Sequence, residues 1–136
     1  MSRGPSHPPV AVKHQVIARD GGFCLLAFSE CLGEAQTTDH RANRGQGGSR
    51  LLNDPVNLIA ACSLCNNAKA DARALQLLRL EQRGLWVRPD STHAKTLERA
   101  RRTPVEGLDG RWWMLLSATE RCEVPPPVGG VLLCTA

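Results

Sequence analysis

The residues that decide the fold are CLLAFSEC at 24–31, TTDH at 37–40 and NLIAACSLCNNAK at 57–69. The first and third of these stretches each contain a cysteine pair, Cys24/Cys31 and Cys62/Cys65. Four cysteines in two pairs are typical of a tetrahedral zinc site, whose thiolates stabilise a domain with a small core. We therefore expect a structural zinc ion on these four cysteines.

The residues around the cysteines predict short strands and helices in alternation. Residues 35–41 and 57–61 read as two short strands, and a Pro-opened amphipathic helix is expected over about 10–20. Ser63 is a good N-cap for a helix that runs to about Gln82. We expect its buried stripe to consist of Leu64, Ala68, Ala72, Leu75 and Leu78.

The second half of the chain gives weaker signals. A basic helical stretch is expected at 91–102. Asp109-Gly110 is a strong hairpin turn between residues 104–108 and 111–117. The Pro- and Gly-rich sequence from Val124 onward reads as loosely ordered. The resulting division is a disordered leader at 1–9, a metal-containing domain at 10–84, a helix and hairpin appendage at 85–123, and a tail at 124–136.

Bulk properties limit the class of protein. The 136 residues carry a formal net charge of +4, which suits an anionic partner without identifying it. No apolar run is long enough to cross a bilayer, and the first ten residues lack the apolar stretch of a signal peptide. We therefore expect a cytoplasmic protein without membrane contact, in which paired cysteines hold metal more often than they form disulfides.

The sequence resembles the HNH endonuclease family in six features. They follow one another along the chain in the order Cys24/Cys31, Asp39, His40, Asn57, Cys62/Cys65 and Asn66. The similarity is greatest to the small HNH proteins of phages and prophages, and it covers roughly residues 10–80. It implies an α+β fold of the ββα-metal, treble-clef-like type, in which a hairpin and a helix enclose one catalytic divalent ion. It also implies a phosphodiester hydrolase that acts on double-stranded DNA.

The resemblance assigns a role to each polar residue between and after the cysteine pairs. His40 would be the general base, Asp39 would bind the catalytic metal, and Asn57 would brace the loop that carries His40. Asn66 stands where the name-giving members have their last histidine. Because an amide oxygen is a hard ligand, this departure favours Mg²⁺ or Mn²⁺ as the catalytic ion. Asn66 also reads simply as a residue of the helix N-terminus.

Basic residues around this motif are candidates for contacts with the DNA backbone. Lys69 and Arg73 follow Asn66 at helical spacing and share its face. A Gly-rich segment on the other side supplies three arginines, Arg41, Arg44 and Arg50. Such contacts predict salt-sensitive binding with little sequence preference.

Three other functions are compatible with the same residues. One is a zinc-knuckle DNA-binding module without catalysis, and another is a phage packaging or accessory nuclease that needs a partner protein. The third is a nuclease directed at RNA or at branched structures. The sequence leaves the cleavage specificity, the oligomeric state and the role of residues 85–136 open.

Overall fold

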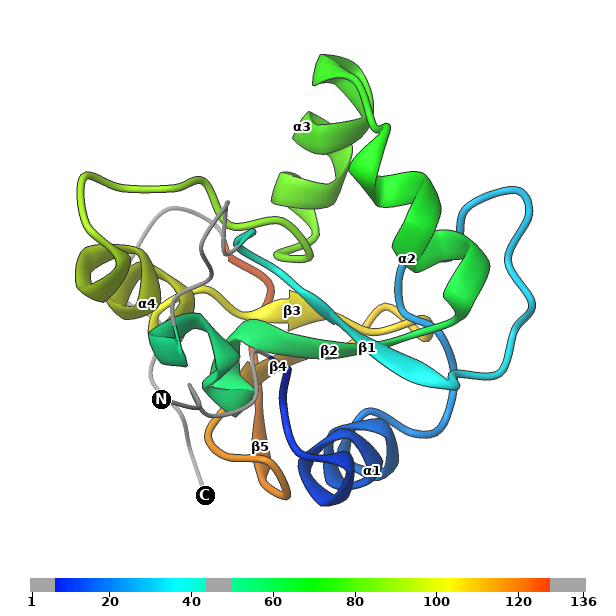
Figure 1. Ribbon diagram of the computed structural model, residues 1–136, viewed down its shortest axis with the longest axis horizontal. Coiled ribbons are helices and arrows are strands. Elements are labelled where there is room, and N and C mark those ends of the chain that lie inside the picture. Colours follow the sequence, from blue (N-terminus) through cyan, green and yellow to red (C-terminus); the bar gives the residue numbers. More distant parts are fainter. Residues whose placement is uncertain (1–6, 44–49, 128–136) are drawn as a thin grey trace, which may run out of the picture.

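A pair of short antiparallel strands carries the central part of the sequence. Strand β1 (Thr37–His40) pairs with β2 (Leu58–Ala61), so that Asp39 lies opposite Ile59 and His40 opposite Leu58. All four residues of β2 are buried, as its uninterrupted apolar sequence requires. In the computed structural model, which describes residues 7–43 and 50–127, helix α1 packs against both strands and α2 lies on the other side, next to β1 (Figure 1).

Helix α1 (Val10–Arg19) has the position that the sequence predicts. It buries Val16 completely, and its last residue, Arg19, turns inward together with Asp20. The helix ends before Gly21 and Gly22, which adopt φ angles of 92° and 85°. This left-handed region favours glycine, so the Gly-Gly pair ends the helix and directs the chain toward Cys24.

The helix expected over 63–82 is two helices. Helix α2 (Ser63–Ala70) ends at Asp71, and α3 (Ala74–Gln82) begins after Arg73. The predicted buried stripe is wrong as well, because Leu64, Leu75 and Leu78 are 44%, 60% and 45% exposed. Instead α2 buries Cys65 and α3 buries Leu80. Figure 1 shows α3 projecting away from the rest of the molecule.

The second half of the chain forms a helix and a three-stranded antiparallel sheet. Helix α4 (His93–Arg101) is followed by strands β3 (Val105–Glu106), β4 (Trp112–Leu115) and β5 (Arg121–Val124), in the order β3-β4-β5. The turn at Asp109-Gly110 joins β3 to β4, as predicted. Strand β5 is missing from the sequence prediction, which begins a loosely ordered tail at Val124, the last residue of this strand.

Two 3₁₀ helices complete the described elements. They are η1 (Arg50–Asn53) and η2 (Pro55–Asn57), and they lead directly into β2. Residues 1–6, most of the predicted leader, and residues 128–136 of the predicted tail lie outside the described residues.

One buried core joins the two halves of the sequence. Cys24, Cys62 and Cys65 belong to the same apolar cluster as Leu97 of α4 and Leu115 of β4. The architecture is therefore α+β, with small antiparallel sheets and four described helices around a shared core. No helix in the described ranges is long and apolar enough to traverse a bilayer.

Candidate functional site

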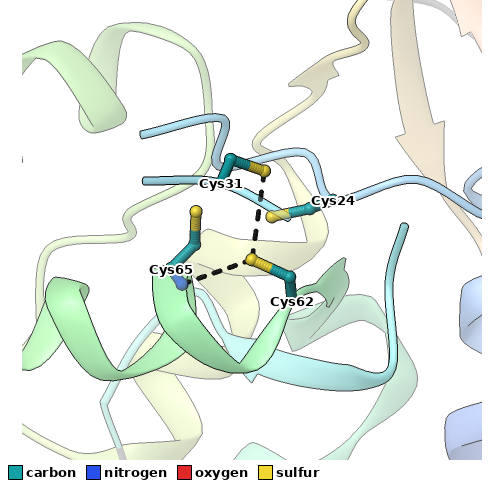
Figure 2. A group of neighbouring side chains, drawn as sticks. All are labelled: Cys24, Cys31, Cys62 and Cys65. Carbon is teal, nitrogen blue, oxygen red and sulfur yellow. Dashed lines mark hydrogen bonds between the residues drawn. The ribbon is translucent and has the colours of Figure 1, made fainter. Parts of the chain in front are cut away.

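Two short segments bring the four cysteines together. Cys24 and Cys31 lie in a loop that closes on itself, since the amide of Cys24 donates to the carbonyl of Gly33 at 2.8 Å. Gly33 has a φ of 88°, a conformation that allows this closure. Cys62 is the N-cap of α2, and Cys65 lies in its first turn. Figure 2 shows the thiols converging from the loop and from the start of α2.

The geometry of the cluster suits a metal ion. The four sulfur atoms all lie within 4.8 Å of one another, and those of Cys31 and Cys62 are 3.9 Å apart. Four thiolates at the usual zinc–sulfur distance would be separated by about 3.8 Å. The four thiols form no disulfide with one another. They could therefore bind a metal ion such as zinc, as the cysteine spacing predicts.

Hydrogen bonds prepare one of these thiols for the thiolate state. Burial acts to raise the pKa of Cys62, but the amides of Leu32 and Cys65, with the neighbouring thiols, lower it to about 6. Cys24 is different, because burial raises the pKa of its thiol. A bound cation would favour the thiolate form of all four side chains.

A cavity of about 340 Å³ lies beside the β1–β2 pair. Asp39 and His40 line it from β1, and Asn66 and Lys69 from α2. Trp86, which follows α3 in the chain, lines it as well. The structure therefore brings the adjacent residues Asp39 and His40 of the sequence prediction together with Asn66 and Lys69, which follow more than 25 positions later in the chain.

Lys69 makes an ion pair with Asp39. The ammonium donates to the carboxylate of Asp39 at 2.5 Å and to the carbonyl oxygen of His40 at 2.7 Å, and both side chains are 9% exposed. Burial raises the pKa of Asp39, and Lys69 opposes that shift through its charge. Burial also lowers the pKa of Lys69, and Asp39 opposes that shift in turn. Each charge depends on its partner, because removal of either would leave the other buried and unpaired.

His40 and Asn57 are held by specific hydrogen bonds. The Nε2 atom of His40 lies 2.8 Å from the side-chain oxygen of Asn53. Asn57, which is completely buried, accepts from the amide of Ala42 at 2.9 Å. Its Nδ2 donates to the carbonyls of Ala42 and Leu52 at 3.0 and 2.9 Å. Asn57 thus braces the segment that follows His40.

The predicted DNA contacts fall into three groups. Arg50 and Arg73 are exposed and stay candidates for such contacts, whereas Arg44 lies outside the described residues. Lys69 faces inward toward Asp39. Arg41 is completely buried, and its guanidinium donates to main-chain carbonyls at 3.1 Å (Gly84), 2.8 Å (Thr103) and 2.9 Å (Ala100). For Arg41 the prediction of a DNA contact is wrong, since its guanidinium is buried and engaged inside the protein. Lys69 lines the cavity beside Asp39, and its contact with DNA stays a prediction.

Trp86 and Asn53 are among the residues at this site that were not singled out in the sequence. Trp86 contributes to the cavity wall, and Asn53 contacts His40. The sequence gives a turn signal at Asn53-Asp54-Pro55 but nothing that links Asn53 to a histidine 13 positions earlier. Comparisons with protein-family models, curated proteins and solved structures found no match to this chain.

Proposed function

We propose that this protein is a metal-dependent DNA endonuclease of the HNH type, which hydrolyses phosphodiester bonds in double-stranded DNA. One observation carries the proposal. Asp39, His40 and Asn66 line a single cavity on a unit of two strands and a helix, and that helix begins within a four-cysteine cluster. The sequence resemblance and the spatial grouping are independent arguments for the same chemistry.

In this proposal the residues have separate tasks. His40 accepts a proton from the attacking water, a task suited to neutral imidazole near physiological pH. Asp39 and Asn66 would hold Mg²⁺ or Mn²⁺, for which carboxylate and amide oxygens are suitable ligands. When bound, such an ion would supply positive charge for the phosphate and the leaving oxygen. Asn57 keeps the segment after His40 in place through its bonds to Ala42.

The four cysteines have a structural task in this proposal. Zinc bound there would fix the start of α2 against the loop at 24–33, and α2 carries Asn66 and Lys69. The exposed cations Arg50 and Arg73 are the described candidates for contacts with the DNA backbone. Such contacts would make binding fall steeply as salt is added.

The ion pair between Lys69 and Asp39 favours a second candidate, a zinc-stabilised DNA-binding module without catalysis. An ammonium already neutralises the Asp39 carboxylate, and a divalent ion would have to share that group or displace Lys69. In the binding module the same ion pair would be permanent and structural.

Nicking of supercoiled plasmid distinguishes the two candidates. Zinc-loaded protein freed of other divalent ions is supplied with Mg²⁺, Mn²⁺ or neither, and is compared with His40→Ala and Asp39→Asn. We expect metal-dependent nicking by the wild type and a loss of at least about a hundredfold in His40→Ala. His14→Ala, which alters an exposed histidine of α1, is the matched control and retains activity.

Plasmid binding is measured in parallel by gel shift. Binding by the wild type without nicking under any of these conditions would refute a nuclease that acts alone, and would leave the binding module and the partner-dependent nuclease. Nicking that persists in His40→Ala would refute the assignment of the base.

A further inference from the structure

The hydrogen bond between His40 and Asn53 determines which nitrogen of the imidazole carries the proton. The Nε2 atom of His40 lies 2.8 Å from the side-chain oxygen of Asn53. An amide oxygen only accepts hydrogen bonds, so a hydrogen bond to this oxygen requires the proton on Nε2 and leaves the lone pair on Nδ1. A general base needs its lone pair on a defined nitrogen, and a partner on the other nitrogen usually fixes this choice.

Asn57 holds the main chain on both sides of this contact. Its amide group accepts from the Ala42 amide and donates to the Ala42 carbonyl, two residues after His40. The same group donates to the carbonyl of Leu52, the residue before Asn53. One buried side chain therefore fixes the two segments that carry His40 and Asn53.

The segment that carries Asn53 is also held by contacts with α4. Leu52 is only 1% exposed, and η1 packs against α4. Asp54 follows immediately; its carboxylate caps η2 through the amide of Val56 and pairs with Arg101 of α4 at 3.1 Å. Asn53 thus extends from a main chain that is fixed on both sides, which is the condition for holding another side chain in one orientation.

We propose that Asn53 is a positioning residue for His40. It holds the imidazole in one orientation and in the tautomer with the proton on Nε2, so that Nδ1 is the nitrogen that accepts a proton. The role of Nδ1 as the proton acceptor in DNA hydrolysis rests on the proposed function. The orientation and tautomer of His40 are properties of the folded protein and can be measured without any substrate.

The test combines NMR with kinetics on the full chain. Imidazole ¹⁵N chemical shifts identify the protonated nitrogen, and the spectrum of His40→Ala assigns the His40 signals. In the wild type at neutral pH we expect a proton on Nε2 of His40 that exchanges slowly with water. In Asn53→Ala this signal should exchange rapidly and disappear, and kcat should fall about ten- to a hundredfold with little change in KM.

Two further variants separate positioning from a general loss of structure. Asn53→Asp keeps an oxygen acceptor at the same place, so it should retain the slowly exchanging Nε2 proton and exceed Asn53→Ala in kcat. Asn67→Ala removes an exposed amide from α2 and should behave as the wild type in both measurements.

The outcomes for this inference and for the nuclease proposal are distinct. A proton on Nδ1 of His40 in the wild type, or an unchanged Nε2 signal in Asn53→Ala, would overturn the inference whether or not DNA is cut. The expected spectra in a protein that cuts no DNA would uphold the contact and its tautomer while refuting the nuclease.

Discussion

At the scale of single residues, the protein is notable for cations whose charged groups lie inside it. The guanidinium of Arg41 is completely buried and binds the main-chain carbonyls of Val56, Gly84, Ala100 and Thr103. Burial lowers its pKa to about 9, which still leaves it charged at neutral pH. Arg41 therefore links the segment after β1 to the loops before and after α4.

Substitution of Arg41 by alanine should destabilise the protein strongly. The change would leave four carbonyl groups without their buried donor and create a cavity, and we expect a loss of at least about 3 kcal/mol in the free energy of unfolding. Urea denaturation followed by circular dichroism measures this loss. Arg79→Ala, at an exposed position of α3, is the matched control and should change stability by less than about 0.5 kcal/mol. Equal effects of the two substitutions would contradict the internal role of Arg41.

At the scale of elements, the chain forms two helices, α2 and α3, instead of one, and the two helices bury different kinds of side chain. The inward face of α2 consists of Cys65 and, one turn later, Lys69, whose ammonium reaches Asp39. This polar anchor keeps the end of α2 against β1. Helix α3 then departs in a new direction, and only Leu80 among its residues is fully buried.

Substitution by alanine should destabilise the protein much more at one leucine of α3 than at another. Leu80 is 3% exposed and Leu78 is 45% exposed. We expect Leu80→Ala to lower the free energy of unfolding by about 2–5 kcal/mol, because it removes buried methyl groups and leaves a cavity. Leu78→Ala should cost less than about 1 kcal/mol. Chemical denaturation of both variants tests this, and a larger loss for Leu78 would restore the buried stripe that the sequence suggested.

The elements that sequence patterns identified are those with local signals. The cysteine spacing, the Gly-Gly end of α1 and the Asp109-Gly110 turn are readable because each depends on residues close together in the chain. Strand β5 was missed because its four residues, RCEV, are followed by three prolines, which favour an irregular segment.

The candidate site was predictable only in part, because some of its side chains are positioned by contacts with residues distant in the sequence. Asp39, His40, Asn57 and Asn66 follow a recognisable order, and three of them line the cavity. A lysine or an arginine gives no sequence signal that it will be buried, since charged residues usually lie on the surface. The inward positions of Lys69 and Arg41 depend on acceptors supplied by distant parts of the chain.

At the scale of the whole molecule, the cysteine cluster and the C-terminal elements share a core. Cys24 and Cys62 lie in the same buried cluster as Leu97, Val105 and Leu115. Arg19 and Arg41 add hydrogen bonds from the first half of the chain to carbonyls of the second half. The segment 10–84, which is expected to contain the metal site, thus contributes only part of the core in which it lies.

A fragment comprising residues 10–84 should therefore fail to fold stably, even with zinc present. It lacks the apolar residues of α4, β3 and β4 and the carbonyl acceptor of Thr103 for Arg41. We expect no cooperative urea transition for the fragment under conditions in which the full chain gives one. A cooperative transition of similar stability would establish 10–84 as an independent domain.

Removal of a zinc ion bound by the four cysteines should destabilise the whole molecule, because the cysteine cluster shares its core with the C-terminal elements. Incubation of zinc-loaded protein with a strong chelator should release one zinc ion per chain and abolish the thermal transition. Tryptophan fluorescence should change at the same time, since Trp86 and Trp113 pack against the shared core. Cys62→Ser should reproduce this behaviour, and a stable folded protein after chelation would contradict a structural role for zinc.

The two buried arginines, Arg19 and Arg41, form hydrogen bonds with residues far along the sequence, and this affects the time course of folding during synthesis. Arg19 binds the carbonyl of Ser117, 98 positions later, and Arg41 binds that of Thr103, 62 positions later. Contacts so distant in sequence slow folding. The four cysteines of the cluster are all synthesised by residue 65, about 3 to 10 s before Ser117 at ordinary rates of translation. During that interval the thiols are not yet buried by the C-terminal residues of the shared core. The nascent chain is then most sensitive to oxidation and to the supply of zinc.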